Sequence, residues 1–243
     1  MLRKLLLTVP LFFIFLLSAC YTTPPNPQTP RDPFQHLNRD TTRFNDKIDK
    51  AVFKPVAQGY KAITPYFFRR SVTNFFSNLA GLDTIGNDLL QGDVGWALSD
   101  FWRFVINTTV GIVGIFDPAR HLGLVKHKND FGLTLNRWHF YSAYFVLPFL
   151  GPNTINTTIA LPVDYYIGLS RRVFTAPQWI AALVLYLVNK RAQLLGREKT
   201  ANGLMLDPYI FYQNAYFQYR AHLLQINRDG PFLNNEQTGE TNE

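Results

Sequence analysis

The sequence predicts an all-α domain. Apolar residues recur at the three- and four-residue spacing of an amphipathic helix in several long segments. Hydrophobic residues make up 47% of the 243 residues and charged residues only 17%, which excludes a disordered protein, because disorder needs few hydrophobic residues and a high net charge. Residues 33–226 contain no obvious linker, so we expect them to form one domain.

The first predicted helix begins at Asp32 and Pro33. Asp32 suits the N-cap, and Pro33 suits the first helical position, where a backbone N–H is not needed. The apolar residues that follow at helical spacing are Phe34, Leu37, Phe44, Ile48 and Val52. Charged residues occupy the opposite side, so this helix is predicted to be amphipathic.

A second helix is predicted from Asp93, because apolar residues recur at i, i+3, i+4, i+7 and i+11. These residues are Val94, Ala97, Leu98, Phe101 and Val105. Further along, the apolar stretches 111–118 and 147–152 contain Gly and Pro and are too short to span a membrane. Each of them predicts a turn or a hairpin.

A third helix is predicted over Thr175–Leu195, with Thr175 as its candidate cap, Pro177 in its first turn and Gly196 as its stop. Residues 179–188 are apolar on every face, which is typical of a helix buried in a core or in lipid. Ten residues cover about 15 Å, so this segment is long enough to enter one leaflet but not to cross a bilayer. The sequence leaves the core and the lipid alternatives open.

The fourth helix is predicted from Asp207 and Pro208. One of its faces carries Tyr209, Tyr212, Tyr216 and Tyr219. A tyrosine stripe suits either a membrane boundary, where the ring is in apolar surroundings and the hydroxyl is wet, or packing against another protein. Residues 227–243 are polar and are expected to form a disordered tail.

The N-terminal residues predict export and lipidation. Arg3 and Lys4 precede the apolar run Leu5–Leu17, and the small residues Ser18 and Ala19 precede Cys20, the sole cysteine. Residues 17–20 resemble a bacterial lipobox, in which the cysteine is acylated and cleavage makes it the first residue. We therefore expect a signal peptide over 1–19, an acylated, palmitate-bearing Cys20 with a Pro-rich tether over 20–32, and a helical domain over 33–226.

The position after the cysteine and the mature charge indicate where such a lipoprotein resides. Tyr21 stands where the Asp of inner-membrane retention would be, which favours the outer membrane. Removal of residues 1–19 lowers the net charge from +7 to +5. The basic residues form small groups without a run of five, so no nucleic-acid partner is expected, and anionic lipid headgroups or an acidic partner fit better.

Motifs for catalysis, nucleotide binding and metal binding are absent from the sequence. The nearest two of the five histidines, His121 and His127, are six residues apart, which does not suit a helical metal site. We therefore predict no catalytic residues, no metal and no cofactor. His127 and Asp130 are the one local pair of interest, and we expect a loop salt bridge between them.

Short stretches spread in order from about residue 32 to 220 carry a family resemblance. They include Lys54-Pro55-Val56-Ala57, Asn87-Asp88-Leu89-Leu90-Gln91-Gly92, Leu161-Pro162-Val163-Asp164-Tyr165 and Arg191-Ala192-Gln193-Leu194-Leu195. In these stretches the chain resembles the VacJ/MlaA lipoproteins. One departure is the absence of glycine from residues 136–143, where many relatives have a Gly-rich hinge, so gating through such a hinge is in doubt.

The resemblance implies an all-helical ring of amphipathic helices, partly embedded in the outer membrane, around a central channel. It implies a lipid-anchored protein on the periplasmic side of the outer membrane that removes misplaced phospholipids from the outer leaflet. The implied partners are phospholipid, a trimeric porin and the periplasmic lipid carrier of the Mla system. The family protein is not an enzyme.

Polar residues on mostly apolar segments are candidates to line such a channel. They are Asn74, Asn78, Asn87, Gln91 and Asn107. Helix capping or hydrogen bonding in the core is the alternative role for each of them. Two other functions remain open: a porin-associated structural lipoprotein without transport activity, and a lipid-cleaving enzyme, for which the sequence offers no evident nucleophile and base.

Overall fold

A computed structural model describes residues 32–140, 143–168, 170–202 and 205–237. The predicted signal peptide, Cys20 and the tether up to residue 31 lie outside these residues. The described part is helical except for one two-stranded antiparallel hairpin, which confirms the predicted all-α fold class.

The elements follow one another through short connections. They are α2 (Gln35–Ile48), the π-helical turn η1 (Asp49–Phe53), α3 (Lys54–Ile63), α4 (Tyr66–Gln91), α5 (Val94–Thr109), the 3-10 turn η2 (Pro118–Leu122), α6 (Phe131–Arg137), β1 (Tyr144–Leu147), β2 (Gly151–Thr154), α7 (Ile155–Ile167), the 3-10 turn η3 (Ser170–Val173), α8 (Ala176–Asn202) and α9 (Pro208–Gln237).

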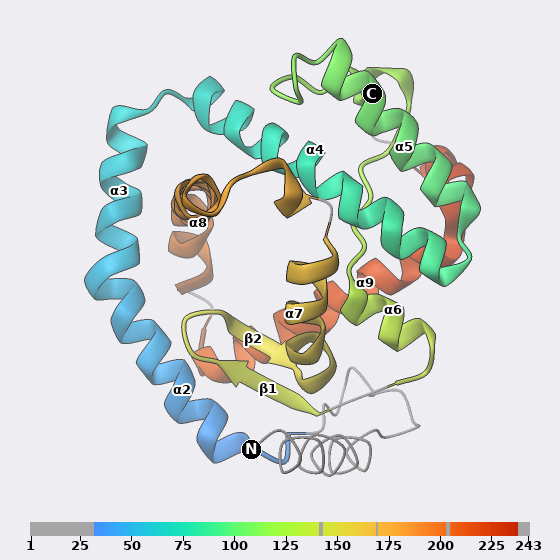
Figure 1. Cartoon of the computed structure of the whole chain (residues 1–243). Helices are drawn as coiled ribbons and strands as arrows, with labels where there is room; N and C mark the ends of the chain where they lie inside the picture. Colours follow the sequence, from blue (N-terminus) through green and yellow to red (C-terminus); the bar gives the residue numbers. More distant parts are fainter. Residues whose placement is uncertain (1–31, 141–142, 169, 203–204, 238–243) are drawn as a thin grey trace, which may run out of the picture.

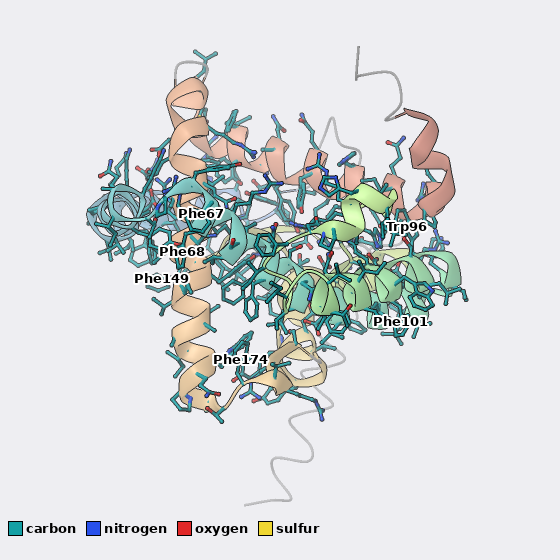
Figure 2. All side chains as sticks on the ribbon, turned by 90° about the horizontal axis from the view of Figure 1, so that it is seen from above. Phe67, Phe68, Trp96, Phe101, Phe149 and Phe174 are labelled. Carbon is teal, nitrogen blue, oxygen red and sulfur yellow. The ribbon has the colours of Figure 1, made fainter. Side chains whose placement is uncertain are left out.

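The helices form a flat ring-like body with one helix standing across it. In Figure 1, α2, α3 and α4 follow one another around the edge, and α5 folds back beside α4. The hairpin and α7 lie inside this edge, with α9 behind them. Helix α8 is seen end-on in Figure 1 and upright in Figure 2, so it runs across the plane of the other helices.

Two prolines shape the edge of the ring. Pro55 lies in the first turn of α3 and has no N–H to donate to the preceding turn, and the chain passes from α2 to α3 through the wider turn of η1 without a break. Pro65 disfavours a helical conformation at Thr64, which is extended and ends α3. The chain therefore curves at the first proline and turns at the second.

Asparagine side chains join α2 to the hairpin. The Asn38 side chain is buried, accepts a hydrogen bond from the Val146 amide at 2.9 Å and donates to the Tyr144 carbonyl at 3.2 Å. Asn45 contacts Leu147 and Phe149 in the same way, at 2.9 and 2.8 Å. Both side chains occupy the free edge of β1 as a neighbouring strand would.

Asp32 and Pro33 do not start a helix. Helix α2 begins at Gln35, and no side chain caps it. The Asp32 carboxylate instead accepts hydrogen bonds from Asn38, from the Tyr209 hydroxyl and from Gln213. Asp32 therefore fastens the start of the domain to α9, a long-range role that local sequence cannot reveal.

The predicted end of the third helix at Gly196 is wrong, because α8 continues to Asn202. Arg191 binds Asp49 at 2.6 Å and Glu198 at 3.0 Å, and Lys54 binds Glu198 at 2.8 Å. Glycine inside a helix costs roughly 1 kcal/mol relative to alanine. These ion pairs hold α8 on both sides of Gly196 and offset that cost.

The predicted start of the polar tail at residue 227 is also wrong for the described residues. Helix α9 continues to Gln237, with a kink at Gly230, whose φ is 79°, before Pro231. The Asn227 side chain is buried and contacts His127. Polar composition alone suggested a tail because it could not show this partner.

The apolar segment of α8 is not a buried core helix. Ile180 is 63% exposed and Val184 55% exposed, which overturns the core alternative. The tyrosine face of α9 is split, because Tyr209 is buried against Tyr144 whereas Tyr219 is exposed. Among the described residues, no helix combines the length and the hydropathy needed to cross a bilayer.

Candidate functional site

Helices α4 and α5 form an antiparallel pair that positions a small polar pocket. Gly92 ends α4 with a φ of 76°, its N–H bonds to the last turn of the helix, and Asp93 starts α5 as the sequence predicts. This tight reversal lays the two helices side by side (Figure 1). Polar residues near the middle of α4 therefore face those of α5.

The pocket has a volume of about 30 Å³. One water needs roughly 10–15 Å³ of such a cavity, so the pocket has room for water and is small for a lipid-binding site. Its walls come from α4, α5 and the segments on either side of η2. The lining residues are Asn74, Ser77, Asn78, Gly81, Asp100, Arg103, Phe104, Asn107, Asp117, Lys126 and His127.

Three of the five candidate channel residues meet at this pocket: Asn74, Asn78 and Asn107. The Asn74 amide donates to the Ile115 carbonyl at 3.1 Å, and Asn78 donates to Thr108 at 2.9 Å. The Asn74 amide fastens residues 111–116, which form the predicted turn, against α4, and the Asn78 amide joins α4 to the last turn of α5.

Asn107 is held by residues just after that turn. Its amide donates to Asp117 at 2.9 Å, and its side-chain oxygen accepts from the Ala119 amide at 3.1 Å. The pocket wall on the α5 side is therefore fixed by hydrogen bonds that involve both ends of the Asn107 side chain.

The other two candidates, Asn87 and Gln91, belong to a separate buried network with α6. Gln91 donates to Asn129 at 2.7 Å and to Thr134 at 2.9 Å, and Thr134 donates to Asn87 at 2.8 Å. Their hydrogen bonds are those of residues that join helices in a core.

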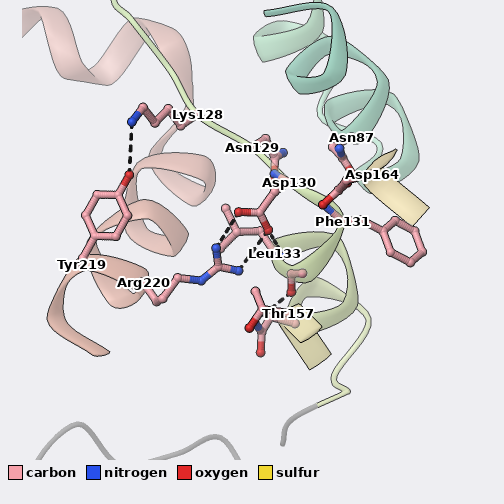
Figure 3. A network of polar contacts seen from close by, with 12 residues as sticks. Asn87, Lys128, Asn129, Asp130, Phe131, Leu133, Thr157, Asp164, Tyr219 and Arg220 are labelled. Carbon is pink, nitrogen blue, oxygen red and sulfur yellow. Dashed lines mark hydrogen bonds and ion pairs between the residues drawn. The ribbon is translucent and has the colours of Figure 1, made fainter. Parts of the chain in front are cut away.

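The predicted salt bridge between His127 and Asp130 is wrong. The Asp130 carboxylate instead accepts hydrogen bonds from two guanidinium nitrogens of Arg220, at 2.5 and 3.1 Å (Figure 3). It also caps α6 by accepting a hydrogen bond from the Leu133 amide at 2.8 Å. His127 has other partners, Asp100 of α5 and Asn227 of α9.

His127 is buried between α5 and α9. One ring nitrogen lies 2.8 Å from Asp100, the other lies 2.6 Å from the Asn227 side-chain oxygen, and Trp96 stacks on the ring. Burial alone lowers the pKa of His127, but the hydrogen bond and charge of Asp100 outweigh it and raise the pKa above its ordinary value.

Asp88 lies beside His127 and lacks a partner for one carboxylate oxygen. Burial raises its pKa to about 7, although Asn129 and His127 oppose that rise. Asp88, Asp100 and His127 bring ligand-type atoms within 4.8 Å of one another. Hydrogen bonds already engage both ring nitrogens of His127, so in this structure the cluster is a buried hydrogen-bonded network.

Sequence reasoning missed the charged residues of the pocket. Arg103 binds Asp117 at 2.5 Å and the Leu124 carbonyl at 2.5 Å, and its side chain is mostly buried. Burial lowers the pKa of Lys126, and the nearby Lys128 and Arg103 lower it further. The available signal was the run Asp100, Arg103 and Asn107, which places three polar side chains on one face of an apolar helix.

The exterior of the molecule exposes many large apolar side chains. Phe67 at the start of α4 is 70% exposed and Phe149 is 62% exposed, and Figure 2 places Phe101 and Phe174 on the side opposite α9. Scattered apolar residues are normal on a soluble surface, whereas large contiguous patches mark contact with a membrane or another protein. The site thus combines a polar interior with an apolar exterior.

A mainly helical body with a polar interior and exposed apolar side chains is typical of a protein whose surface contacts an apolar medium. Residues 30–223 match the family model described as "MlaA lipoprotein". The chain belongs to the MlaA lipoprotein family.

Individual relatives agree with the family match. The "Intermembrane phospholipid transport system lipoprotein MlaA" of Escherichia coli is 32% identical over 215 residues, which cover 84% of this chain and 82% of that protein. An uncharacterised protein of Rickettsia prowazekii is 37% identical over 139 residues. This match covers 56% of this chain and 55% of that protein.

A solved structure has the same fold. It is described as "Structural basis for maintenance of bacterial outer membrane lipid asymmetry". The TM-score is 0.70 at 29% identity, and the match covers 79% of this chain and 98% of that chain.

Proposed function

We propose that this protein is the outer-membrane lipoprotein of an intermembrane phospholipid transport system. In this role it removes phospholipids misplaced in the outer leaflet and passes them to a periplasmic carrier, which maintains lipid asymmetry. The observation that carries the proposal is the apolar exterior around a polar interior, in a chain whose Escherichia coli relative is named for phospholipid transport.

The apolar exterior supports partial embedding in the membrane. Ile63, Phe67 and Tyr166 are among the most exposed large apolar side chains, and they come from α3, α4 and α7. Burying such groups in hydrocarbon stabilises the embedded state by roughly 25 cal/mol per Å². No spanning helix is needed for this, because the edge of a helical ring can lie within one leaflet.

The polar interior supports a lipid-handling role. A charged headgroup at mid-bilayer costs several kcal/mol, and polar groups along a path lower that cost. Asn74, Asn78 and Asn107 supply amides at the pocket, and Lys126, which forms no ion pair within the described part of the chain, supplies positive charge for a phosphate. Because the pocket is only about 30 Å³ in volume, we infer that α4 and α5 or the turn 111–116 must move apart during passage.

Anchoring completes the proposal. Cys20 would carry the acyl chains that hold the protein on the periplasmic side, since two or more chains give stable attachment. A trimeric porin is the proposed neighbour in the membrane, and the periplasmic carrier of the system is the proposed recipient of the lipid. The role involves no cofactor and no bond-breaking step.

Deletion of the gene and labelling of surface-exposed phospholipid test the proposal. Outer-leaflet phospholipid should rise on deletion, return to normal with the wild-type protein, and stay high with Cys20→Ala at equal protein level. Unchanged outer-leaflet phospholipid after deletion would favour a structural, porin-associated lipoprotein. Release of lysolipid by the purified protein would favour an enzyme.

A further inference from the structure

The turn η3, between α7 and α8, holds a pair of arginines in a fixed position. The Ser170 amide donates to the Asp83 carboxylate at 3.1 Å, and the Ser170 hydroxyl donates to the same carboxylate. Asp83 belongs to α4, so the turn is fastened to the edge of the ring. Arg171 and Arg172 follow directly and share this support.

Arg171 is oriented but lacks an anion. Its guanidinium carbon lies 4.2 Å from the centre of the Tyr165 ring, and its Nε is buried without a hydrogen-bond partner. No carboxylate among the described residues forms an ion pair with Arg171 or Arg172. The buried arginines elsewhere are paired, Arg103 with Asp117 and Arg220 with Asp130.

A buried guanidinium donor without an acceptor is unfavourable, because its lost contact with water is not replaced. Stacking on Tyr165 fixes the plane of the guanidinium, and its terminal nitrogens, which have no hydrogen-bond acceptor in the residues that the structure describes, remain available to an incoming group. The geometry is that of a preformed anion-binding site at Arg171 and Arg172, the anion seat, whose acceptor comes from outside the chain.

The surroundings of the seat are apolar. Tyr166 is 72% exposed, and Val173 and Ile180 are also well exposed on either side of the turn. Figure 2 places Phe174 at the end of α8 that projects from the flat body, on the side opposite α9. An anion that binds here must therefore belong to a molecule that tolerates an apolar environment.

We propose that Arg171 and Arg172 bind the phosphate diester of a phospholipid headgroup while its acyl chains lie on the neighbouring apolar side chains. This proposal rests on the proposed function, since it assigns a lipid contact to a lipid transporter. Guanidinium groups form paired, charge-assisted hydrogen bonds with phosphate oxygens, which suits a diester better than a point charge would. The pocket between α4 and α5 is too small to be this first contact.

Lipid binding to the full mature protein in a phosphate-free maltoside detergent tests the seat. The probes are dihexanoyl-phosphatidylethanolamine, dihexanoylglycerol, which lacks the phosphate, and inorganic phosphate, which lacks the acyl chains. We expect the phosphatidylethanolamine alone to bind and to shift the NMR signal of the Arg171 Nε–H group. Equal binding of dihexanoylglycerol, or equal binding of inorganic phosphate, would overturn the proposal.

Charge variants complete the test. The double variant Arg171→Gln, Arg172→Gln should bind the phosphatidylethanolamine about tenfold or more weakly, since each charged hydrogen bond contributes strongly. Arg171→Lys should lie between, because it keeps the charge and loses the paired geometry. Arg120→Gln with Arg228→Gln removes two exposed charges and should bind as the wild type does.

Unchanged affinity in the Arg171 and Arg172 double variant, with a normal thermal transition, would overturn the seat. The deletion experiment separates this failure from failure of the proposed function. If deletion raises outer-leaflet phospholipid while the double variant still binds lipid, the transport function is supported and the proposed anion seat is wrong. If deletion changes nothing while binding depends on Arg171, the seat stands and the transport function falls.

Discussion

Arginines in the polar interior around α5 have carboxylate partners, whereas in the described part of the chain the arginines of the turn η3 do not. In the interior, Arg103 and Arg220 each bind a carboxylate of the chain. At η3, Arg171 lies on an aromatic ring and its buried Nε has no acceptor. The interior thus pairs its arginines with carboxylates of the chain and so fixes the shape of the ring, whereas Arg171 at the apolar edge has no carboxylate partner among the described residues.

Breaking an interior pair should give the largest effect on stability. Arg220→Ala removes both hydrogen bonds to Asp130 and the packing of a mostly buried side chain, so the free energy of unfolding should fall by about 2–3 kcal/mol. Thermal unfolding in detergent measures this. Arg43→Ala is the matched control, since its pair with Asp40 is exposed and worth at most about 0.5 kcal/mol. Equal effects of the two variants would remove the contrast between interior and surface.

The interior should also respond to pH. The folded-state pKa of Asp88, about 7, lies above its ordinary value of 3.8, so the folded state holds more protons between these values and stability falls as pH rises through them. The raised pKa of His127 acts in the same direction, because its stabilisation is present at low pH and lost above the folded pKa.

Asp88→Asn isolates the part of this dependence that comes from Asp88. The neutral side chain should raise the free energy of unfolding at pH 8 by about 2 kcal/mol and flatten its decline between pH 4 and pH 7. Unfolding measured across this range gives the slope. A variant with the wild-type slope would show that Asp88 is ionised in the folded protein throughout.

The turn 111–116 connects the interior to the apolar edge. Alanine substitutions at Gly114 and, as a control, at Gly59 test how closely this turn packs. Gly114 has a φ of 83°, and an added Cβ would lie 2.6 Å from the Asn78 Cβ, so Gly114→Ala should destabilise by about 1–2 kcal/mol and reduce transport. Gly59→Ala meets nothing within 4 Å inside α3 and should stabilise by about 0.5–1 kcal/mol. Unchanged transport in the Gly114→Ala variant would show that the packing of this turn has no role in transport.

The apolar edge should show the smallest effect on stability and a clear effect on membrane binding. Val184→Asn replaces an exposed side chain, so the free energy of unfolding in detergent should change by at most about 0.5 kcal/mol. Binding of the non-acylated protein to phospholipid vesicles should weaken, as measured by flotation. The exposed Gln178→Asn gives a control without loss of apolar surface. Unchanged flotation of Val184→Asn would place α8 outside the lipid.

Sequence patterns predicted the elements that local residues determine. The starts of α5 and α9 follow from Asp93 and from Asp207 with Pro208, because capping and periodicity act within a few residues. The end of α8 and the reach of α9 could not be predicted in this way. Each depends on a distant partner, Asp49 in the first case and His127 in the second.

The candidate site was predictable only in part for the same reason. Periodicity marked Asn74, Asn78 and Asn107 as polar residues on apolar segments, and these three meet at the pocket. The same signal marked Asn87 and Gln91, whose partners are Asn129 and Thr134 in another segment. The spacing of polar residues shows which face they share and does not show which element covers that face.

Photo-crosslinking in cells tests the central claim most directly. A photoreactive amino acid placed at Asn78 probes the pocket, and one at Ile180 probes the apolar edge. When phospholipid accumulates in the outer leaflet, the account predicts phospholipid adducts at both positions, with the adduct at position 78 lost in the Gly114→Ala variant. Adducts at position 180 alone would contradict the account, because the protein would then touch the membrane without passing lipid through its polar interior.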